Sequence, residues 1–398
     1  MRAFFNRTLS KSNFYREYFK DGEFVFRNVP IIGKKEFMEN FNQINTVNID
    51  RENAMNVAIE SEKSRDFKSE IHGITVGLST GTSGKRGIFL VSENERAQWV
   101  GIVLNRILKP KLFKKQKIAF FLRANSNLYT SVQSNFFEFK YFDIFRPMVE
   151  IIEEVNTYQP DILAAQPSIL MEIAKRQQLG KIELNVQQII SFAEVLHEHD
   201  AFIIEKIFMA PIQEIYQCTE GLLGVSCKEG TIHLNEDVIH VEQEWIDEDK
   251  FHPIITDFTR KSQPVIRYRM NDVLQIKATP CSCGSKFMAI EKIIGRDDDV
   301  LYFDEIPVFP DVIARKIALA TDDFLQYEII QSNPYDIIVH LDCEEHIFET
   351  TSITITKILR DILENNGLQK QIQIQVYRKP IILNGNKQRK IRRQINEN

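Results

Sequence analysis

Residues 78–87 read Leu-Ser-Thr-Gly-Thr-Ser-Gly-Lys-Arg-Gly, and they follow an apolar run, Ile71 to Leu78. The pattern predicts a strand that enters a loop rich in glycine and hydroxyl groups. Glycines let backbone N–H groups close on phosphate oxygens, hydroxyls add donors, and the lysine adds a positive charge. The loop is not a Walker loop, because that motif has four residues between its first glycine and the Gly-Lys pair, and here two intervene. A phosphate-binding loop and a flexible surface turn both remain open from these residues alone.

The composition is that of a folded protein with more than one core. A length of 398 residues favours two or three domains. Hydrophobic residues make up 43% and charged residues 26%, which excludes collagenous and disordered classes. Lys and Arg number 50 against 55 Asp and Glu, a net charge of −5, so we expect no nucleic-acid partner. We find no signal peptide and no apolar run of about 20 residues, so we expect a cytoplasmic protein without a membrane partner.

Strand and helix patterns alternate in the middle of the chain. Lys117 to Leu122 and Asp161 to Ala165 are short apolar runs typical of buried strands, and Pro147 to Tyr158 and Pro167 to Leu179 are typical of helices. This alternation predicts an α/β protein of layered sheets and helices.

The pattern changes near Asp298. Phe324 to Ile330 and Tyr335 to Leu341 predict paired strands, an amphipathic helix ends at Gly367, and Gln371 to Tyr377 alternates as a half-exposed strand does. We therefore expect a large N-terminal α/β domain over 1–297 and a small C-terminal α+β domain over 298–398.

Five segments, taken together, resemble the adenylate-forming (AMP-binding) superfamily in its own motif order. Residues 79–87 are similar to its nucleotide loop, 191–194 (Ser-Phe-Ala-Glu) to its segment along the adenine, and 216–220 (Tyr-Gln-Cys-Thr-Glu) to Tyr-Gly-x-Thr-Glu. Residues 264–272 resemble Arg-Tyr-Arg-Thr-Gly-Asp, and 295–299 (Gly-Arg-Asp-Asp-Asp) resemble the Gly-Arg-x-Asp-Asp hinge. Val308-Phe309-Pro310 follows, as in the phenylacetate–CoA ligase and CapK-like branch. The matches span about residues 75 to 310 and imply that the large domain is an adenylation domain and the small one mobile.

The resemblance implies roles for individual residues, with ATP or AMP and Mg²⁺ as cofactors. The implied phosphate loop comprises Ser79, Thr80, Gly81, Thr82, Ser83, Gly84 and Lys85. The implied nucleotide contacts are Ala193 and Glu194 along the adenine, Tyr216 stacking on it, Thr219 at the α-phosphate, Glu220 holding Mg²⁺, Asp272 at the ribose hydroxyls, and Arg296. Asp298 would be the hinge. Arg86 replaces the proline of the family's loop, a change compatible with a surface position.

The C-terminal segment 384–393 (Asn-Gly-Asn-Lys-Gln-Arg-Lys-Ile-Arg-Arg) is basic, and a solvated tail would have this composition. In the family a lysine after a glycine near the C-terminus enters the active site during adenylation. Lys387 is the candidate, and Lys390 is the alternative because Asn386 separates Lys387 from the glycine.

Three cysteines and a histidine form a second candidate site. Cys227, His233, Cys281 and Cys283 would make a closed tetrahedral set for a structural Zn²⁺, with no open position for catalysis. The phenylacetate–CoA ligase branch has Cys, His and a Cys-x-Cys loop at corresponding places. The alternative is that Cys227 is a small buried residue and His233 an ordinary strand histidine. Cys218 and Cys343 are expected to serve in packing.

The leading functional hypothesis is a two-step ligase that adenylates an aromatic or acyl carboxylic acid, releases pyrophosphate and passes the acyl group to an acceptor. The acceptor stays open between coenzyme A, an amine, a hydroxyl and a carrier-protein thiol, and a homodimer is a further expected partner. Coenzyme A is the less favoured acceptor because Glu305 stands where the ligases have glycine. The alternatives are a phenylacetate–CoA ligase-like activity, nucleotidyl transfer to a hydroxyl, as in the related deazaflavin nucleotidyl synthetases, and a zinc-stabilised ligand-binding protein without catalysis.

Overall fold

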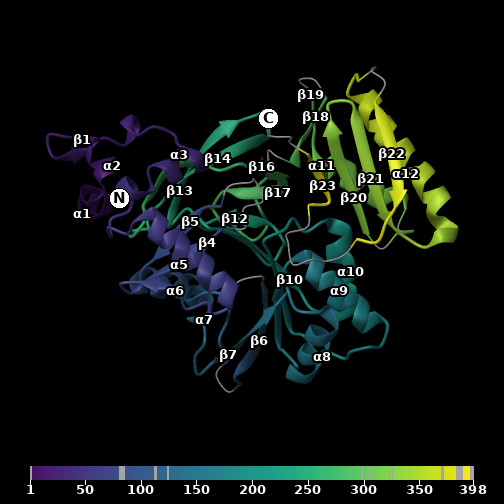
Figure 1. The fold of residues 1–398 in the computed structure, drawn as a ribbon, viewed down its shortest axis with the longest axis horizontal. Coiled ribbons are helices and arrows are strands. Elements are labelled where there is room, and N and C mark those ends of the chain that lie inside the picture. The colour runs from purple at the N-terminus through teal and green to yellow at the C-terminus, as the bar shows by residue number, and fades with distance from the viewer. Residues whose placement is uncertain are drawn as a thin grey trace.

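The computed structural model describes residues 2–79, 86–111, 114–122, 125–296, 299–303, 306–321, 323–324, 326–368, 372–381 and 389–394. Three regions follow one another along the chain: an N-terminal group of short helices, a large mixed sheet with its covering helices, and a smaller C-terminal sheet with one long helix. The C-terminal sheet and its helix lie beside the large sheet, and the N-terminal helices lie at the opposite side (Figure 1).

The large sheet contains twelve strands among the described residues. Their order is β13 (Ile239–Trp245), β14 (Lys250–Asp257), β16 (Asp272–Ile276), β17 (Ala289–Arg296), β12 (Ile232–Leu234), β11 (Gly221–Ser226), β10 (Ile212–Cys218), β9 (Gln188–Phe192), β8 (Ile162–Ala165), β6 (Gln116–Leu122) and β7 (Phe137–Asp143), and β15 (Val265–Arg269) pairs with β14. From β7 to β10 neighbouring strands are parallel, and from β10 to β13 they are antiparallel. The direction of pairing therefore changes at β10.

The parallel half is covered on both faces, as its apolar strands require. Phe121, Leu163 and Ile189 point to one face, where they pack under α8 (Met148–Tyr158), α9 (Pro167–Gln178) and α10 (Glu198–Phe208). Phe120 precedes Phe121 on β6, and Ala164 follows Leu163 on β8. Both therefore point to the other face, toward α6 (Glu93–Arg106) and α7 (Asn127–Thr130). The predicted strands and helices of this region are confirmed to within a residue or two at their ends.

The N-terminal region packs on the antiparallel half through an apolar cluster rich in aromatic side chains. Its elements are α1 (Arg2–Thr8), η1 (Leu9–Lys11), α2 (Asn13–Arg16), β1 (Phe19–Lys20), β2 (Glu23–Phe24), η2 (Phe26–Asn28), α3 (Lys34–Glu39), α4 (Phe41–Ile44) and α5 (Arg51–Ser64). A three-stranded sheet follows, formed by β3 (Glu70–Ile71), β4 (Ile74–Leu78) and β5 (Ile88–Val91).

The apolar run 71–78 is not one strand, as predicted, but most of a hairpin. His72 and Gly73 form its turn, with φ angles of 51° and 75°, and two such residues make the tight turn that joins paired strands. The turn was missed because the histidine lies in the left-handed region, which the apolar pattern does not reveal.

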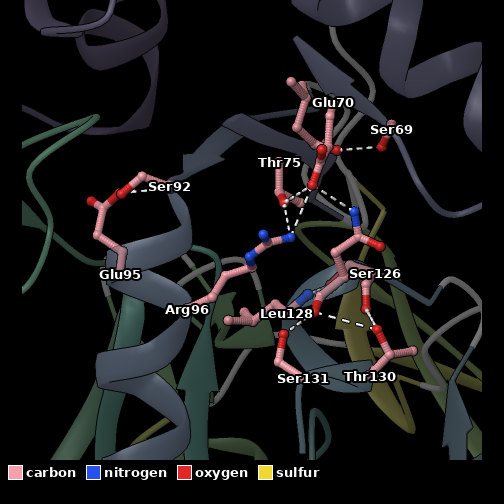
Figure 2. A network of polar contacts seen from close by, with 12 residues as sticks. Ser69, Glu70, Thr75, Ser92, Glu95, Arg96, Ser126, Leu128, Thr130 and Ser131 are labelled. Atoms are coloured by element: carbon pink, nitrogen blue, oxygen red, sulfur yellow. Dashed lines mark hydrogen bonds and ion pairs between the residues drawn. The ribbon is translucent and has the colours of Figure 1, made fainter. Parts of the chain in front are cut away.

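A polar network ties this small sheet to the helices over the large one (Figure 2). Arg96 of α6 donates to the Glu70 carboxylate over 2.9 Å and to the Thr75 hydroxyl over 3.1 Å. Asn127 of α7 donates to the same carboxylate over 2.8 Å. The sheet that ends in the glycine-rich loop is thus fixed relative to α6 and α7.

The C-terminal elements have a core of their own. They are β18 (Leu301–Phe303), β19 (Ile306–Val308), α11 (Pro310–Ala320), β20 (Gln326–Asn333), β21 (Asp336–Asp342), α12 (Glu345–Asn365), β22 (Gln373–Arg378) and β23 (Ile391–Arg393). Gly367, with φ 75°, follows the end of α12 as a helix-ending glycine does. The predicted α/β class is confirmed, while the division at 297/298 remains our proposal. None of the described helices combines the length and apolar character needed to cross a bilayer.

Candidate active site

The ends of two parallel strands bring the candidate nucleotide residues together. Because β9 and β10 pair in parallel, with Phe192 opposite Ile215, the segments that follow them leave the sheet at the same edge. Ala193 and Glu194 follow β9, and Thr219 and Glu220 follow β10. In open α/β sheets this edge is where ligands bind.

Ala193 and Glu194 make a sharp departure from β9. Ala193 has a φ of 70°, a left-handed conformation that is uncommon for a residue with a side chain. The Glu194 carboxylate accepts a hydrogen bond from the backbone N–H of Ser168, at the start of α9, over 3.2 Å. The chain therefore turns away from the direction of β9 at the sheet edge where this strand ends.

Three of the predicted nucleotide residues form one chain of contacts. The Tyr216 hydroxyl donates to the Asp272 carboxylate over 2.7 Å. Asp272 pairs with Arg296 in the β16–β17 ladder, and the Arg296 Nε lies 3.7 Å from the same carboxylate. Burial raises the pKa of Tyr216 well above its usual value, with the Asp272 charge adding to the effect, so the phenol remains a neutral donor.

Thr219 and Glu220 are held by two residues that the sequence analysis did not assign. The Glu220 carboxylate accepts from the Thr219 hydroxyl and from the Tyr268 hydroxyl, each over 2.8 Å. Arg260, which is buried, donates to the Thr219 carbonyl over 3.2 Å. Tyr268 lies inside the 264–272 segment, and its place in the alternation of side chains along β15 could have indicated it. No feature of the sequence indicated Arg260.

Two cavities lined by described residues meet at these groups. One, of about 460 Å³, extends between the sheet and α6, and the other, of about 660 Å³, extends toward the C-terminal segment. The side chains that line both include Ala193, Gln217, Asp272 and Arg296. The candidate residues therefore lie where the cavity under α6 meets a second cavity that is lined by more charged side chains.

Glu214 is a further residue of the cleft that sequence reasoning missed. It lies two positions before Tyr216 on β10, so its side chain is on the same face, and it lines the larger cavity. Burial raises the pKa of this carboxyl to about 7. The spacing from Tyr216 could have indicated it.

The two ends of the glycine-rich loop are joined. The Ser79 N–H donates to the Gly87 carbonyl over 2.8 Å, and the Gly87 N–H donates to the Ser79 hydroxyl over 2.7 Å. Thr80 to Lys85 lie outside the described residues. Arg86 is not a plain surface residue, because it pairs with Glu62 of α5 and its Nε donates to the Ser79 carbonyl over 3.2 Å. It anchors the base of the loop.

The C-terminal segment reaches the large sheet's helices. The Lys390 ammonium lies 2.9 Å from the Asp200 carboxylate on α10, and Arg389 pairs with Asp299. Burial and the nearby Lys390 charge lower the pKa of His197 to about 4. Lys387, Asp298 and Glu305 lie outside the described residues, so the choice of adenylation lysine, the hinge and the expected obstacle to coenzyme A all stay predictions.

The four candidate zinc ligands are brought together, although 54 residues separate Cys227 from Cys281. Their ligand atoms all lie within 4.8 Å of one another. The Sγ atoms of Cys227 and Cys281 are 3.7 Å apart, and Cys283 Sγ is 3.3 Å from His233 Nε2. A tetrahedral ion with Zn–S bonds of about 2.3 Å places two sulfurs about 3.8 Å apart.

The surroundings of this cluster fit metal binding as well. His233 Nδ1 lies 3.1 Å from the Phe287 carbonyl, a contact that directs Nε2 toward the thiols. Hydrogen bonds, first of all from the backbone N–H of Cys283, lower the pKa of the Cys281 thiol to about 6, whereas burial raises the pKa of the Cys227 thiol. The thiolate that metals bind is therefore favoured at Cys281 and not at Cys227. Cys227 lies at the turn of the antiparallel hairpin that β11 and β12 form, and His233 lies on β12.

Comparisons with known proteins find relatives among adenylate-forming proteins and the same fold in solved structures of such enzymes. The chain is 25% identical over 281 residues to protein CapK of Staphylococcus aureus, covering 69% of this chain and 56% of that protein. It is 23% identical over 194 residues to a phenylacetate–coenzyme A ligase of Thermus thermophilus, covering 44% of this chain and 43% of that protein. These matches span about half the length of the curated relatives. No protein-family model matches the chain.

The solved structure of a 2-hydroxyisobutyryl-CoA ligase has the same fold. In its postadenylation state it superposes with a TM-score of 0.69 at 14% identity, covering 97% of this chain and 86% of that chain. In its thioesterification state the TM-score is 0.54, with 93% and 83% covered. The resemblance drawn from the motifs is thus confirmed: the chain is similar to the phenylacetate–CoA ligase-like branch of the adenylate-forming superfamily.

Proposed function

We propose that the protein binds ATP and a carboxylic acid and joins them as an acyl-adenylate with release of pyrophosphate. The observation that carries the proposal is the meeting of the Tyr216–Asp272–Arg296 chain with the Thr219–Glu220 pair at the mouth of the apolar cavity. One cavity can hold the body of an acid, and the adjoining cleft can hold a nucleotide. The fold shared with adenylate-forming ligases supports this division of the site.

The nucleotide would lie in the cleft of about 660 Å³. We assign the ribose hydroxyls to the Asp272 carboxylate, which Arg296 and Tyr216 already orient. The base would lie along Ala193, Glu194 and the Tyr216 ring. Glu214 stands close by on the same strand face, where a half-buried carboxyl can bind the polar edge of a base by hydrogen bonding.

Attack of the acid's carboxylate on the α-phosphate makes negative charge that the site must stabilise. The Thr219 hydroxyl and the Lys85 loop would donate to the phosphate oxygens. Glu220 has both carboxylate oxygens oriented by hydroxyl donors and retains acceptor capacity, so it fits Mg²⁺, which binds carboxylates and phosphates together. A bound Mg²⁺ would neutralise charge on the phosphates.

The C-terminal segment would complete the site during adenylation. The higher TM-score against the postadenylation state than against the thioesterification state supports an adenylation arrangement of the C-terminal elements. Because the Lys390 ammonium is already paired with Asp200, we favour Lys387 as the lysine that reaches the nucleotide. We also propose that Cys227, His233, Cys281 and Cys283 hold a structural Zn²⁺ away from this chemistry.

The acceptor of the acyl group is a separate question. The matched ligases carry coenzyme A in their names, which supports coenzyme A as one candidate, while Glu305 in place of glycine disfavours it. Nucleotidyl transfer to a hydroxyl is the alternative reaction on the same fold, and a phenylacetate–CoA ligase-like activity remains a special case of the main proposal.

Carboxylate-dependent exchange of pyrophosphate into ATP tests the proposal. We expect exchange with at least one member of a panel of aromatic and aliphatic acids, and about 100-fold less in Glu220→Gln. Exchange that needs no acid, or AMP transfer to a hydroxyl compound alone, would favour the nucleotidyl-transfer reaction. ATP binding without turnover under any condition would favour a ligand-binding protein. Adding coenzyme A to an accepted acid and measuring thioester then settles the acceptor.

A further inference from the structure

The smaller cavity is apolar over most of its wall, but it also contains a buried amide oxygen that has no hydrogen-bond partner among the described residues. Gln166 follows β8, and the alternation of the strand places it on the same face as Ala164, under α6 and α7. It is 3% exposed and lines the cavity. Its Oε1 atom is buried and accepts no hydrogen bond from any described residue.

Two further polar groups come from the helices opposite. Trp99 of α6 has its indole Nε1 buried without a partner among the described residues. Tyr129 of α7 packs against it edge to face, with ring centroids 5.9 Å apart, and against Phe120 of the sheet at 4.9 Å. Both rings line the same cavity as Gln166. The donors and the acceptor therefore enclose one space from two sides.

Unpartnered polar groups at such positions are costly. A buried amide or indole N–H that loses its water without gaining a partner costs free energy, which is why native proteins satisfy nearly all of them. The neighbouring wall formed by Phe120, Phe192 and Ile190 offers no donor or acceptor side chain. A purely hydrocarbon ligand would fill the cavity and leave the amide and the indole unsatisfied.

We propose that the acid activated here has an apolar skeleton carrying a hydroxyl group, and that Gln166 determines this specificity. The inference rests on the proposed adenylation of an acid. A hydroxyl suits the set because it can donate to an amide oxygen and accept from an indole N–H, whereas a charged substituent would meet no opposite charge at these three residues. The Gln166 amide, which both donates and accepts, is the group that separates hydroxylated acids from their plain counterparts.

Matched acids that differ by one hydroxyl test the proposal: phenylacetic acid with its ring-hydroxylated isomers, and hexanoic acid with its hydroxylated forms. In pyrophosphate exchange we expect at least one hydroxylated acid to exceed its plain counterpart in kcat/KM by about tenfold or more. Gln166→Met keeps the length but removes the hydrogen bonds, and should reduce that ratio to near one. Gln178→Met, an exposed position at the end of α9, the helix that follows Gln166, should leave the ratio unchanged.

The ratio is the decisive readout because a general loss of stability would lower both rates together. Plain acids that match or exceed every hydroxylated counterpart in the wild type would overturn the proposal. So would a preference for hydroxylated acids that persists in Gln166→Met.

Binding can be measured without turnover, which separates this inference from the adenylation itself. The chain has two tryptophans, and Trp245→Phe leaves Trp99 as the single fluorescent reporter in the cavity. Tighter binding of a hydroxylated acid, seen as a change in Trp99 emission and lost in Gln166→Met, would support the specificity even if no exchange were found. Equal binding of both acids would refute the specificity even if exchange were robust.

Discussion

Removal of one thiolate from the cysteine–histidine cluster should unload the metal and destabilise the large domain together. The perturbation is Cys281→Ser, which takes away the buried sulfur that lies 3.7 Å from Cys227. The cluster joins the β11–β12 hairpin to the loop between β16 and β17, and these elements also pair through His233 and Ala289. Strand pairing and the apolar residues around Ile232 and Ile290 survive the change, so we expect a folded but weaker protein.

The magnitude follows from the binding free energy that the fold gains from the ion. A ligand at about 100 times its Kd stabilises the state that binds it by about 2.7 kcal/mol. The entropy of unfolding is about 2.1 cal/mol/K per residue, so for a unit of about 300 residues the loss of about 2.7 kcal/mol should lower Tm by roughly 4 °C. Tighter binding, as in structural zinc sites, would increase the shift.

The assay combines elemental analysis with thermal unfolding of the wild type, Cys281→Ser and Cys343→Ser. Cys343 is a buried cysteine of the C-terminal core, remote from the cluster in the sequence, so its variant controls for loss of a buried thiol. We expect about one zinc per chain in the wild type and in Cys343→Ser, and much less in Cys281→Ser. The reasoning is refuted if chelated wild-type protein keeps its Tm and takes up no zinc when the ion is returned.

Three further predictions concern the nucleotide site and the C-terminal segment. Tyr268→Phe removes a hydrogen bond to the Glu220 carboxylate, and hydrogen bonds to charged groups contribute about 1.5–3 kcal/mol. Adenylation should therefore slow by about 10- to 100-fold and require a higher Mg²⁺ concentration, which a titration of Mg²⁺ in the pyrophosphate-exchange assay measures. Burial raises the pKa of Glu214 to about 7, above its ordinary value of about 4.3. The folded state therefore binds this proton more tightly than the unfolded state, and stability falls as the pH rises from about 4.3 to 7. Thermal melts should give Glu214→Gln a higher Tm than the wild type at pH 8 and no advantage over it at pH 4. Lys387→Ala should lose adenylation by about 100-fold at nearly unchanged ATP affinity, whereas Lys390→Ala should keep most of the rate, and the opposite result would show that Lys390 is the catalytic lysine.

Apolar runs were enough to predict β6 and β8 of the parallel half and the helices α8 and α9, because strands buried on both faces have a near-continuous apolar sequence. The strands β7, β9 and β10 of the same half were not predicted. Contacts that join distant segments were not predictable in the same way. Glu95 of α6 illustrates the limit: its carboxylate accepts the backbone N–H of Ser92 over 2.7 Å and that of Ser262 over 2.9 Å, and Figure 2 shows it turned toward Ser92. A glutamate on an amphipathic helix is ordinarily assigned to the surface, and only the fold shows that this one is buried.

The candidate site likewise contains residues that the sequence predicted and residues that only the fold revealed. Thr219, Glu220 and Asp272 were predicted because each belongs to a short segment with a recognisable order of residue types. Gln166 and Trp99 belong to no such segment, since cavity walls are assembled from several elements whose side chains need only the right size and polarity. We therefore expect the residues of the shared chemistry to be predictable from the sequence, and the residues that would select the substrate to be found only from the packing of the cavity.

The position of Arg296 suggests why nucleotide binding and docking of the C-terminal segment should depend on each other. Its side chain approaches Asp272, and its backbone N–H donates to the Asp299 carboxylate over 3.2 Å. Asp299 in turn pairs with Arg389 of the C-terminal segment. A ribose bound at Asp272 would fix Arg296 and with it the carboxylate that receives Arg389, so ATP should favour the docked segment. Docking would then raise ATP affinity by the same factor, because coupling between two binding events is reciprocal.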